Sequence, residues 1–504
     1  MKQAQNIRQL IKNLEGDPRT ALMAYENGIV KSYTAHLIKK TVDYLSNKMV
    51  SDGLGENDKV ILTGRNSFNL VVHYFAILNI KAIPVLVNPS FTGNLFEEIF
   101  HRTKAKAIFY EEPLKNCGIE KLFFKTFYIV DLEQVATLNY KADLEDDKVE
   151  AGRPATIITS TGTSGLIKLV ELSNENFFSL INIKLSEMQV DSKSIRHLIL
   201  NTLTHMSGLS NLLLVFAGRG LCILCPGHDI LEISIISKEA QPNIITSVPT
   251  LISKMKLFLN NNPALKNSFD SIKMVNFTSA PLNKHLLSYA KSIFRGGLYF
   301  VNRYGSTEAG GGLFGPHPEG LATPELSVGF PRKELSYKLI DGVLMVKGES
   351  VSQNILTARG EISLDKDGYY NTGDVFDVDD KGFYYFKGRL NQDLINCGGY
   401  KFMASDIEAI VLNHPQVLDC KVVAIDDRDK GQKPYAFVLL QEKNSETTEA
   451  HLIDYCLKLM PAYMHPRKIF ILQDFPLNSL GKVNKEHLKK MVLHFINPKG
   501  SNNE

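Results

Sequence analysis

Hydrophobic and polar residues follow two different periods along the chain up to residue 305. Apolar residues recur at helical spacing over Tyr33–Val50 and Phe68–Leu78, and short β-branched runs such as Lys59–Thr63 lie between such segments. The same alternation continues through Ala82–Val87, Ala107–Phe109, Ala155–Thr159, Leu198–Leu200, Leu221–Leu224, Asn243–Thr246, Leu251–Phe258 and Met274–Phe277. This pattern predicts α/β layers.

A different pattern begins at Ser327. From there to Arg389, short β-like runs are separated by turns such as Asp341-Gly342. This pattern predicts a mostly antiparallel, β-rich part over residues 327–389, which completes a large N-terminal domain over residues 1–389.

The segment after Arg389 has the elements of a small α+β domain. Helices are expected over Ser405–Leu412 and Ala450–Met460, and strands over Cys420–Ile425 and Tyr435–Leu440. Such a set is large enough to fold alone. We therefore predict a C-terminal domain over residues 390–504.

Composition and charge exclude several classes of protein. The 504 residues are 44% hydrophobic and 22% charged, as in ordinary globular proteins, and a net charge of +3 supplies no broad basic field for nucleic acid. Six scattered cysteines do not form a disulfide framework, and Met1–Asp17 has no apolar core like that of a signal peptide. Polar residues interrupt Leu70–Val87 and Leu198–Val215, so neither resembles a transmembrane segment. A cytoplasmic protein is expected.

The segment from Ile157 to Lys168 is the clearest candidate for chemistry. A strand runs into a loop whose small and hydroxyl residues offer backbone N–H groups to phosphate oxygens, and a lysine adds positive charge. The candidate phosphate-binding residues are Ser160, Thr161, Gly162, Thr163, Ser164, Gly165 and Lys168. The loop is not a Walker motif, because only two residues separate its glycines. Taken alone, it would read as a polar surface turn.

Four further motifs follow in order along the chain. They are Asn302-Arg303-Tyr304-Gly305-Ser306-Thr307-Glu308, Tyr370-Asn371-Thr372-Gly373-Asp374, Gly388-Arg389 with Asp393 and Gly398-Gly399, and Pro476-Leu477-Asn478-Ser479-Leu480-Gly481-Lys482-Val483-Asn484-Lys485. Together with the phosphate loop, this order resembles the adenylate-forming superfamily of acyl-CoA synthetases, aryl-CoA ligases, luciferases and peptide-synthetase adenylation domains. Weaker similarity extends over nearly the whole chain.

The resemblance implies an ATP and AMP site. Glu308 would hold the Mg²⁺ that bridges the ATP phosphates, and Thr307 would bond the α-phosphate. Asn302 and Tyr304 would flank the adenine, and Asp374 would accept hydrogen bonds from the ribose. Further residues placed at this site by the resemblance are Arg389, on the same sugar, Ala280 and Gly305.

The resemblance also implies a catalytic lysine and a moving domain. Lys482 would neutralise the charge that develops when a carboxylate attacks the α-phosphorus. The mobile C-terminal domain would then rotate and present Gly398 and Gly399 to a tunnel for the thiol, with the hinge at Asn391 or Gln392. The passage from Arg389 to Gly398 is one residue longer than is usual in the family, so the hinge residue stays open.

The acid pocket is predicted from Thr204-His205-Met206-Ser207-Gly208, in which His205 would border the acyl group. The segment lacks the aspartate with which amino-acid-activating members pair the substrate ammonium, so a fatty or aromatic acid is favoured. Gly310, the first of three consecutive glycines, could leave room for such a substrate, or the glycines could only permit a tight turn. Other departures from the family pattern are Ile167, Asn174 and Thr278-Ser279.

Taken together, these features predict an enzyme that joins a carboxylic acid to a thiol at the expense of Mg·ATP. The acceptor is expected to be coenzyme A, and the alternative is the phosphopantetheine arm of an acyl carrier protein. A catalytically silent nucleotide- or acyl-binding protein and luciferase-type oxygen chemistry stay open as other classes. No nucleic-acid partner is expected.

Overall fold

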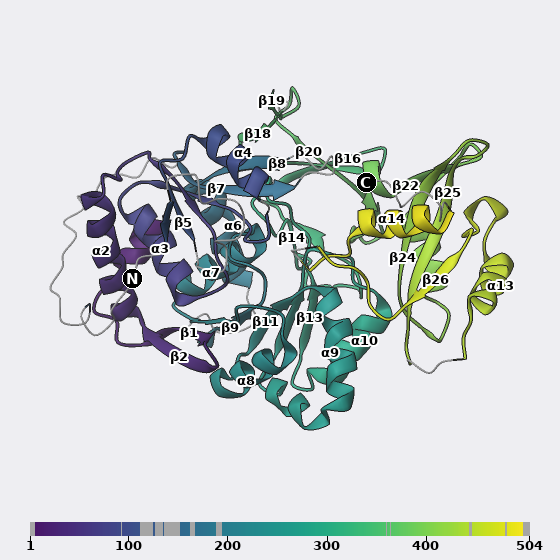
Figure 1. Ribbon diagram of the computed structural model, residues 1–504, viewed down its shortest axis with the longest axis horizontal. Coiled ribbons are helices and arrows are strands. Elements are labelled where there is room, and N and C mark those ends of the chain that lie inside the picture. Colours follow the sequence, from purple (N-terminus) through teal and green to yellow (C-terminus); the bar gives the residue numbers. More distant parts are fainter. Residues whose placement is uncertain are drawn as a thin grey trace.

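The computed structural model describes residues 6–91, 93–110, 124–126, 135, 152–161, 167–187, 194–358, 360–362, 364–442, 446–478 and 481–496. A large N-terminal domain of mixed α/β sheets lies beside a small C-terminal domain, which confirms the predicted fold class (Figure 1). The elements expected between residues 33 and 277 are present, with ends shifted by a few residues.

The first large sheet has eight strands in the order β19-β18-β8-β7-β4-β3-β5-β6. Its strands from β7 to β6 are parallel, whereas β7, β8, β18 and β19 pair antiparallel. The strands are β3 (Lys59–Leu62), β4 (Ile83–Leu86), β5 (Ala107–Tyr110), β6 (Phe124–Thr126), β7 (Pro154–Thr161), β8 (Ile167–Ser173), β18 (Asn354–Thr357) and β19 (Gly360–Glu361).

The second large sheet has seven strands in the order β13-β12-β11-β9-β10-β1-β2. All neighbours are parallel except the hairpin of β1 and β2, which the hydrophobic pattern did not predict. The strands are β1 (Thr20–Glu26), β2 (Ile29–Thr34), β9 (Arg196–Ile199), β10 (Leu221–Leu224), β11 (Ile244–Ser247), β12 (Met274–Phe277) and β13 (Tyr299–Asn302).

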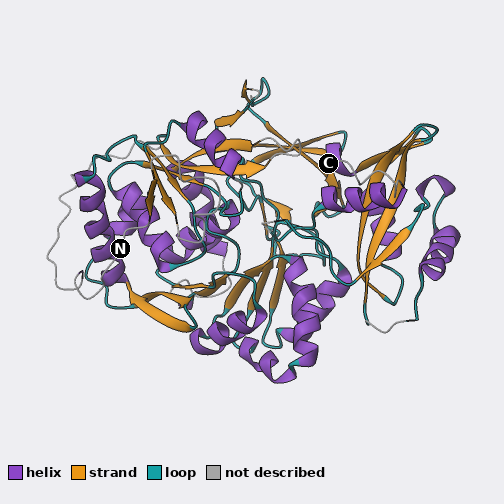
Figure 2. Ribbon diagram, in the orientation of Figure 1, coloured by secondary structure: helices purple, strands orange, loops and turns teal. Residues whose placement is uncertain are grey.

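Helices cover the faces of both large sheets (Figure 2). Several begin at a side chain that accepts the first free backbone N–H groups, such as Ser67 before α3 and Asn283 before α10. The helices of this domain are α1 (Ile7–Lys12), α2 (Ala35–Ser51), α3 (Phe68–Asn79), α4 (Gly93–Thr103), α6 (Asn174–Glu187), α7 (Met206–Ala217), α8 (Ile230–Ala240), α9 (Pro249–Asn261), α10 (Lys284–Ile293) and the 3₁₀ helix η4 (Pro263–Phe269).

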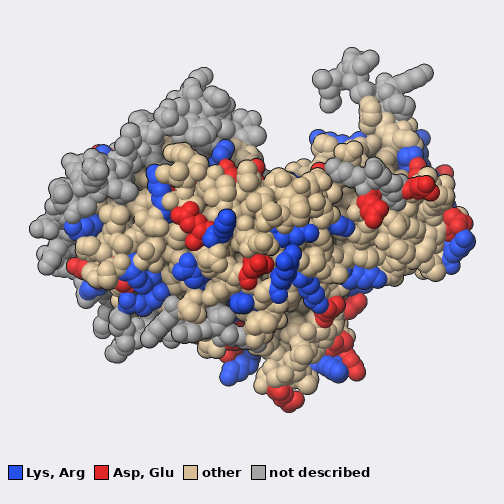
Figure 3. Space-filling view, turned by 90° about the horizontal axis from the view of Figure 1, so that it is seen from below, with Lys and Arg blue, Asp and Glu red and all other residues tan. Residues whose placement is uncertain are grey.

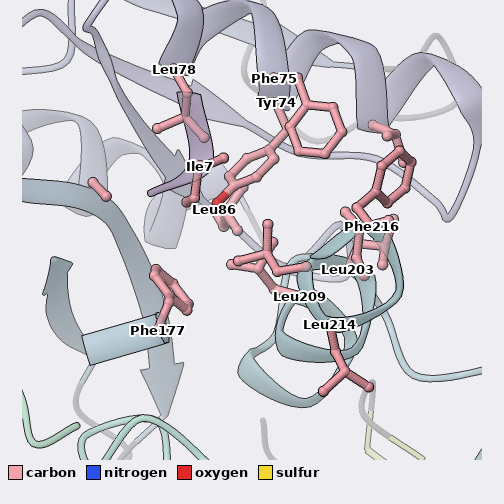
Figure 4. Packing of buried hydrophobic residues seen from close by; sticks show 14 of the residues in the cluster. Ile7, Tyr74, Phe75, Leu78, Leu86, Phe177, Leu203, Leu209, Leu214 and Phe216 are labelled. Atoms are coloured by element: carbon pink, nitrogen blue, oxygen red, sulfur yellow. The ribbon is translucent and has the colours of Figure 1, made fainter. Parts of the chain in front are cut away.

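The main hydrophobic core lies where α3 and α7 meet. Both helices are buried along almost their entire length, because side chains from several elements pack around them. Phe75 and Phe216 meet edge to face, with ring centroids 5.3 Å apart (Figure 4). The Tyr74 hydroxyl lies 2.9 Å from Thr156 Oγ1, so the core also joins α3 to β7.

The β-rich part forms an antiparallel sheet of β16 (Ser336–Ile340), β17 (Val343–Lys347), β20 (Tyr370–Val378) and β21 (Tyr384–Arg389), as predicted. Its middle segment departs from this sheet, because β18 pairs with β8 of the first large sheet. A short pair, β14 (Phe314–Gly315) and β15 (Phe330–Pro331), leads into this region.

The C-terminal domain has its own five-stranded sheet. Its strands are β22 (Leu394–Cys397), β23 (Tyr400–Met403), β24 (Val417–Asp427), β25 (Gly431–Leu440) and β26 (Ile469–Leu472). Its helices are α11 (Leu390–Asp393), α12 (Ala404–Val411), α13 (Glu449–Leu459), η5 (Ala462–Met464) and α14 (Lys485–Ile496). Strands β22 and β23 were not predicted.

The two domains share a hydrophobic cluster. Phe437 and Leu488 of the C-terminal domain belong to the same cluster of buried residues as Leu286 of α10. Polar contacts flank this cluster, since Asn283 Nδ2 donates to Asp419 Oδ1 at 3.0 Å. The segment between β26 and α14, drawn in yellow in Figure 1, reaches back toward β13 and β14 of the large domain.

The surface carries charges of both signs. On the face shown in Figure 3, lysine and arginine are interspersed with aspartate and glutamate. None of the helices described is both long enough and apolar enough to cross a bilayer. The described cysteines, Cys222, Cys225, Cys397, Cys420 and Cys456, are buried and unpaired.

Replacing Phe75 by alanine tests the main core. Because Phe75 is fully buried and packs on Phe216, we expect Phe75→Ala to lower the free energy of unfolding by about 3–5 kcal/mol. Leu298→Ala, at a side chain that is 70% exposed, should change the free energy of unfolding little. Chemical denaturation followed by circular dichroism measures both, and equal losses would show that the core is not assembled as described.

Candidate active site

Charged side chains from separate elements converge where the two domains meet. Glu308 and Asp374 are buried carboxylates, with residue exposures of 7% and 2%. Lys168, Arg389 and Lys482 are the cations whose charges act on them. They come from β8, the end of β21 and the loop before α14, so the site requires both domains.

Glu308 forms an ion pair with Lys168. Lys168 Nζ donates to Glu308 Oε1 at 2.7 Å and lies 3.5 Å from the Tyr370 hydroxyl. Burial opposes ionisation of Glu308, but the Lys168 ammonium outweighs it and holds the pKa of this carboxyl below its ordinary value. Glu308 is therefore an anion near neutral pH.

Asp374 of β20 links the β-rich sheet to the motif that runs from Asn302 to Glu308. The Tyr304 hydroxyl donates to Asp374 Oδ2 at 2.6 Å, and Arg389 Nε lies 2.8 Å from Asp374 Oδ1. Burial raises the pKa of Asp374, and Arg389 and Tyr304 oppose that rise. Apart from this ion pair with Arg389, Asp374 Oδ1 has no hydrogen-bond partner among the described residues, so it can accept one more.

A tight turn presents Lys482 to these carboxylates. Gly481 adopts a left-handed φ of +72°, and Asn478 Oδ1 accepts from the Lys482 N–H at 3.0 Å. Thr250 of α9 donates its hydroxyl proton to the Gly481 carbonyl, which ties the turn to the large domain. Burial and then Arg389 lower the pKa of Lys482 to about 8, while Asp374 and Glu308 act in the opposite direction.

His205 lies at the N-terminus of α7, close enough to Lys482 and Glu308 for their charges to act on it. Burial, with the Lys482 charge, lowers the pKa of His205 to about 3, so the ring is neutral. His205 and His228 line a cavity of about 240 Å³, together with Arg65, Asn66, Asn88, Pro89, Ser90, Leu200, Asn201, Thr202, Ser207, Pro226, Gly227 and Ser279. A Cβ at Gly481 would lie 3.5 Å from His228 Cε1, so the lysine turn borders this cavity.

The phosphate loop itself is only partly placed. Gly162, Thr163, Ser164 and Gly165 lie outside the described residues. The strands on either side pair antiparallel, with Thr161 opposite Ile167 and Ser160 opposite Lys168. Ser160 Oγ is buried and, among the residues described, has no hydrogen-bond partner, so it remains available as a donor.

The structure also describes Asn302, Thr307, Ala280 and Gly305, the other residues predicted at the nucleotide site. Asn302 Nδ2 donates to the Leu326 carbonyl at 2.8 Å, which holds the amide in place. Thr307 is buried and Ala280 is half-buried. A Cβ at Gly305 would lie 2.3 Å from Gly312 N, so only glycine fits there.

One departure from the family pattern, Ser279, and one alternative left open by the sequence, Gly310, have a structural correlate. Ser279 occupies a left-handed φ of +72°, a conformation that glycine adopts at lower cost. Gly310 has a φ of +77°, and a Cβ there would meet the Ser350 carbonyl oxygen at 2.5 Å. Gly310 is therefore required by the turn, and the partly accessible glycines are Gly311 and Gly312.

Gly398 and Gly399 are exposed in the present arrangement. They form the turn between β22 and β23, with φ values of +62° and +86°, and a Cβ at either would meet nothing within 4 Å. The proposed hinge residues Asn391 and Gln392 both lie in the single turn of α11.

Sequence reasoning missed two contributors to the site. Tyr370 stood in a quoted motif but received no role, although its hydroxyl lies beside Lys168. Asp393 accepts from the Arg389 N–H at 2.8 Å and from Lys485 Nζ at 2.6 Å, and so links the β-rich sheet to α14. Only the presence of Asp393 and Lys485 in the motifs signalled this link.

Comparison with known proteins gives one consistent result. The family model for AMP-binding enzyme matches residues 12–361, and the model for its C-terminal domain matches residues 406–482. A probable 4-coumarate–CoA ligase 2 of Dictyostelium discoideum is 24% identical over 95% of this chain and 94% of its own. A 2-succinylbenzoate–CoA ligase of Bacillus licheniformis is 26% identical over 90% and 93%.

A solved structure has the same architecture. The crystal structure of the anthranilate CoA ligase AuaEII in complex with anthranoyl-AMP superimposes with a TM-score of 0.83 at 20% identity, over 97% of this chain and 98% of that one. The family models cover most of the chain. This chain therefore belongs to the AMP-binding enzyme family, the adenylate-forming superfamily.

Proposed function

We propose that this protein is an AMP-forming acid:CoA ligase. In the first step a carboxylate oxygen of the substrate bonds to the α-phosphorus of ATP and the bond to pyrophosphate breaks, which gives an acyl-adenylate. In the second step the sulfur of coenzyme A bonds to the acyl carbon, AMP leaves, and the thiol gives up its proton. The observation that carries the proposal is the position of Lys482, on a turn of the C-terminal domain that Thr250 of α9 contacts, where the charges of Glu308 and Asp374 act on it.

The nucleotide fits the polar groups of the site. Asp374 Oδ1 can accept from the ribose hydroxyls, and Arg389 supports the same sugar. Asn302 Oδ1 can accept from the exocyclic amine of adenine beside Tyr304, because the Asn302 amide nitrogen is already held by Leu326. Thr307, Ala280, Gly305 and the phosphate loop complete this site.

Mg²⁺ fits a site with few protein ligands. Within the described part of the chain, no three metal-ligating side chains come together. Magnesium bound through phosphates commonly uses one carboxylate and keeps several waters, and Glu308 is an ionised carboxylate beside Thr307. When bound, the ion supplies positive charge to the phosphates.

Lys482 supplies the positive charge that adenylation needs. The attacking carboxylate and the α-phosphate are both anions, so their approach is unfavourable unless a cation lies between them. An ammonium that is already buried provides this stabilisation without reorganisation of water. Lys482 is our proposed catalytic residue, with Thr307 and Glu308 acting on the phosphates.

The substrate is proposed from the pocket and the relatives. The relatives include a probable 4-coumarate–CoA ligase and a 2-succinylbenzoate–CoA ligase, which supports coenzyme A as the acceptor and an aromatic acid as the substrate, and a fatty acid is the other candidate. His205 would border the acyl group, and the three-glycine turn that begins at Gly310 would form another part of the acid pocket. An acyl carrier protein is the alternative acceptor. The unpaired described cysteines support a reducing compartment, the cytoplasm.

The second step requires the C-terminal domain to move. In the present arrangement the lysine turn borders the cavity at His228, whereas Gly398 and Gly399 are exposed. We propose that rotation about Asn391 or Gln392, at a domain boundary near residue 390, withdraws Lys482 and brings the two glycines to the thiol.

Pyrophosphate release tests the proposal and the role of Lys482 together. We expect one member of a panel of short, medium, long and aromatic acids to give turnover from Mg·ATP that requires coenzyme A. Lys482→Ala should slow adenylation about 100- to 1000-fold, whereas Lys490→Ala, on the exposed side of α14, should not. A burst of bound adenylate independent of coenzyme A would support the carrier-protein alternative. Equal effects of the two substitutions would contradict the assignment of Lys482.

The pKa of Lys482 predicts a pH profile. Only the protonated lysine carries the charge that adenylation needs, so activity is lost as the pH rises through its pKa of about 8. We expect kcat/KM for ATP to fall by about tenfold per pH unit above that value. In Lys482→Arg, whose guanidinium stays charged, whatever activity remains should show no such fall. An identical profile in that variant would assign the titration to another group.

A substitution at Gly398 separates the two steps. Asparagine tolerates the left-handed φ of +62°, and the space around Gly398 is open, so Gly398→Asn should leave adenylation unchanged. The added side chain should slow transfer to coenzyme A by about tenfold or more if the glycine lines the thiol path. Gly16→Asn, at φ +69° and also in open space, is the matched control. Loss of adenylation in Gly398→Asn would argue against the proposed rotation.

A further inference from the structure

Three cations meet at Gly312, the last residue of the three-glycine turn. Arg332 Nε donates to the Gly312 carbonyl at 3.2 Å. A Cβ at Gly312 would lie 2.6 Å from Lys184 Nζ, so Lys184 lies against the same residue. Burial, Arg332 and Arg303 all lower the pKa of Lys184, which places the Arg303 guanidinium close to the other two.

These charges are not balanced. Glu187, which forms an ion pair with Arg332, is the one carboxylate that the described residues bring to the cluster. Arg332 is 4% exposed, yet within the described part of the chain its Nη2 atom has no hydrogen-bond partner. Among those residues, Lys184 Nζ has neither a hydrogen bond nor an ion pair.

The imbalance has a measurable electrostatic consequence. Burial, with the neighbouring guanidinium groups, lowers the pKa of Lys184 to about 7. Burial and Arg332 likewise lower the pKa of Arg303 to about 10. Mutual repulsion of buried cations is unfavourable unless an anion is placed among them.

The glycine turn connects the cluster with the N-terminus of α7, where His205 lines the cavity. Arg303, Gly312 and Lys184 are each partly accessible, although Leu313 and Phe314 beside them are buried. A Cβ at Gly311 would lie 3.5 Å from Met206, the residue after His205. Gly305, next to Tyr304, abuts Gly312. The turn therefore runs from the phosphate-side residues Thr307 and Glu308 to the cationic cluster.

We propose that Lys184, Arg303 and Arg332 bind a second negatively charged group at the far end of the acid, so that the substrate is a dicarboxylic acid. The inference rests on the proposed acid:CoA ligase activity and narrows its substrate class. One carboxylate would be activated beside Lys482, and the other would lie near Gly312. The second carboxylate would accept hydrogen bonds from Lys184 and from the unpaired Arg332 Nη2.

Matched pairs of acids test this inference on the full-length protein. Pyrophosphate release is compared for butyrate and succinate, hexanoate and adipate, octanoate and suberate, and benzoate and phthalate. We expect the wild type to favour a dicarboxylate over its monocarboxylate partner. Lys184→Met should lower kcat/KM for that dicarboxylate by about 10- to 100-fold by raising its KM. The same substitution should leave kcat/KM for the monocarboxylate and the KM of ATP unchanged. Lys184→Arg, which keeps the positive charge, should restore much of the loss.

Controls separate a local charge effect from misfolding. Lys238→Met, at an exposed lysine of α8, should behave as the wild type. Unchanged thermal stability of Lys184→Met would show that the fold is intact, as expected for a side chain without an ion pair among the described residues.

The outcomes distinguish this inference from the activity on which it rests. Turnover of monocarboxylates with no preference for dicarboxylates, or equal losses for both acids in Lys184→Met, would overturn the inference and leave the ligase activity standing. A raised KM for ATP in that variant would assign the cluster to the nucleotide instead. Absence of pyrophosphate release with every acid would overturn the proposed function and the inference with it.

Discussion

Burial of two carboxylates between the domains is the constraint on which the site depends. Removing Glu308 and Asp374 from water costs several kcal/mol each unless cations and hydrogen bonds compensate. Lys168 compensates Glu308, and Arg389 with Tyr304 compensates Asp374. The two pairs fix β8, β20 and the end of β21 relative to the loop after β13, so the anions of the site also hold its elements together.

Lys482 differs from these two cations in a way that suits its proposed withdrawal. Among the described residues Lys482 forms no direct ion pair, although both carboxylates act on its pKa. Its withdrawal therefore leaves Glu308 and Asp374 still paired. The turn is held instead by backbone contacts such as Thr250 with Gly481, and by the cluster that Phe437 shares with α10. Such an interface can separate without exposing an unpaired charge.

Much of the fold and most of the site motifs could be predicted, because both depend on local sequence. The period of Phe68–Leu78 predicts a helix, which the structure has as α3, and the strand expected over Ala155–Thr159 lies within β7. The β1–β2 hairpin and the departure of β18 to the first sheet were missed, since strand partners are chosen by tertiary packing. The sequence alone is likewise consistent with Gly310 in a pocket or in a tight turn. The structure shows the turn, because a Cβ at Gly310 would clash with the Ser350 carbonyl oxygen.

The cationic cluster shows that functional sites, like strand partners, cannot always be predicted from the sequence. Lys184, Arg303 and Arg332 lie far apart in the chain, and each alone reads as an ordinary surface charge. Their proximity around Gly312 becomes visible only in three dimensions, where a single carboxylate faces them. Natural cores seldom retain such an excess of buried charge without a partner. A ligand anion is the partner that resolves the imbalance, because it can bind when the pocket is occupied and leave with the product. The turn from Gly305 to Gly312 would then hold two anion sites in one pocket, at a spacing that selects the length of the acid.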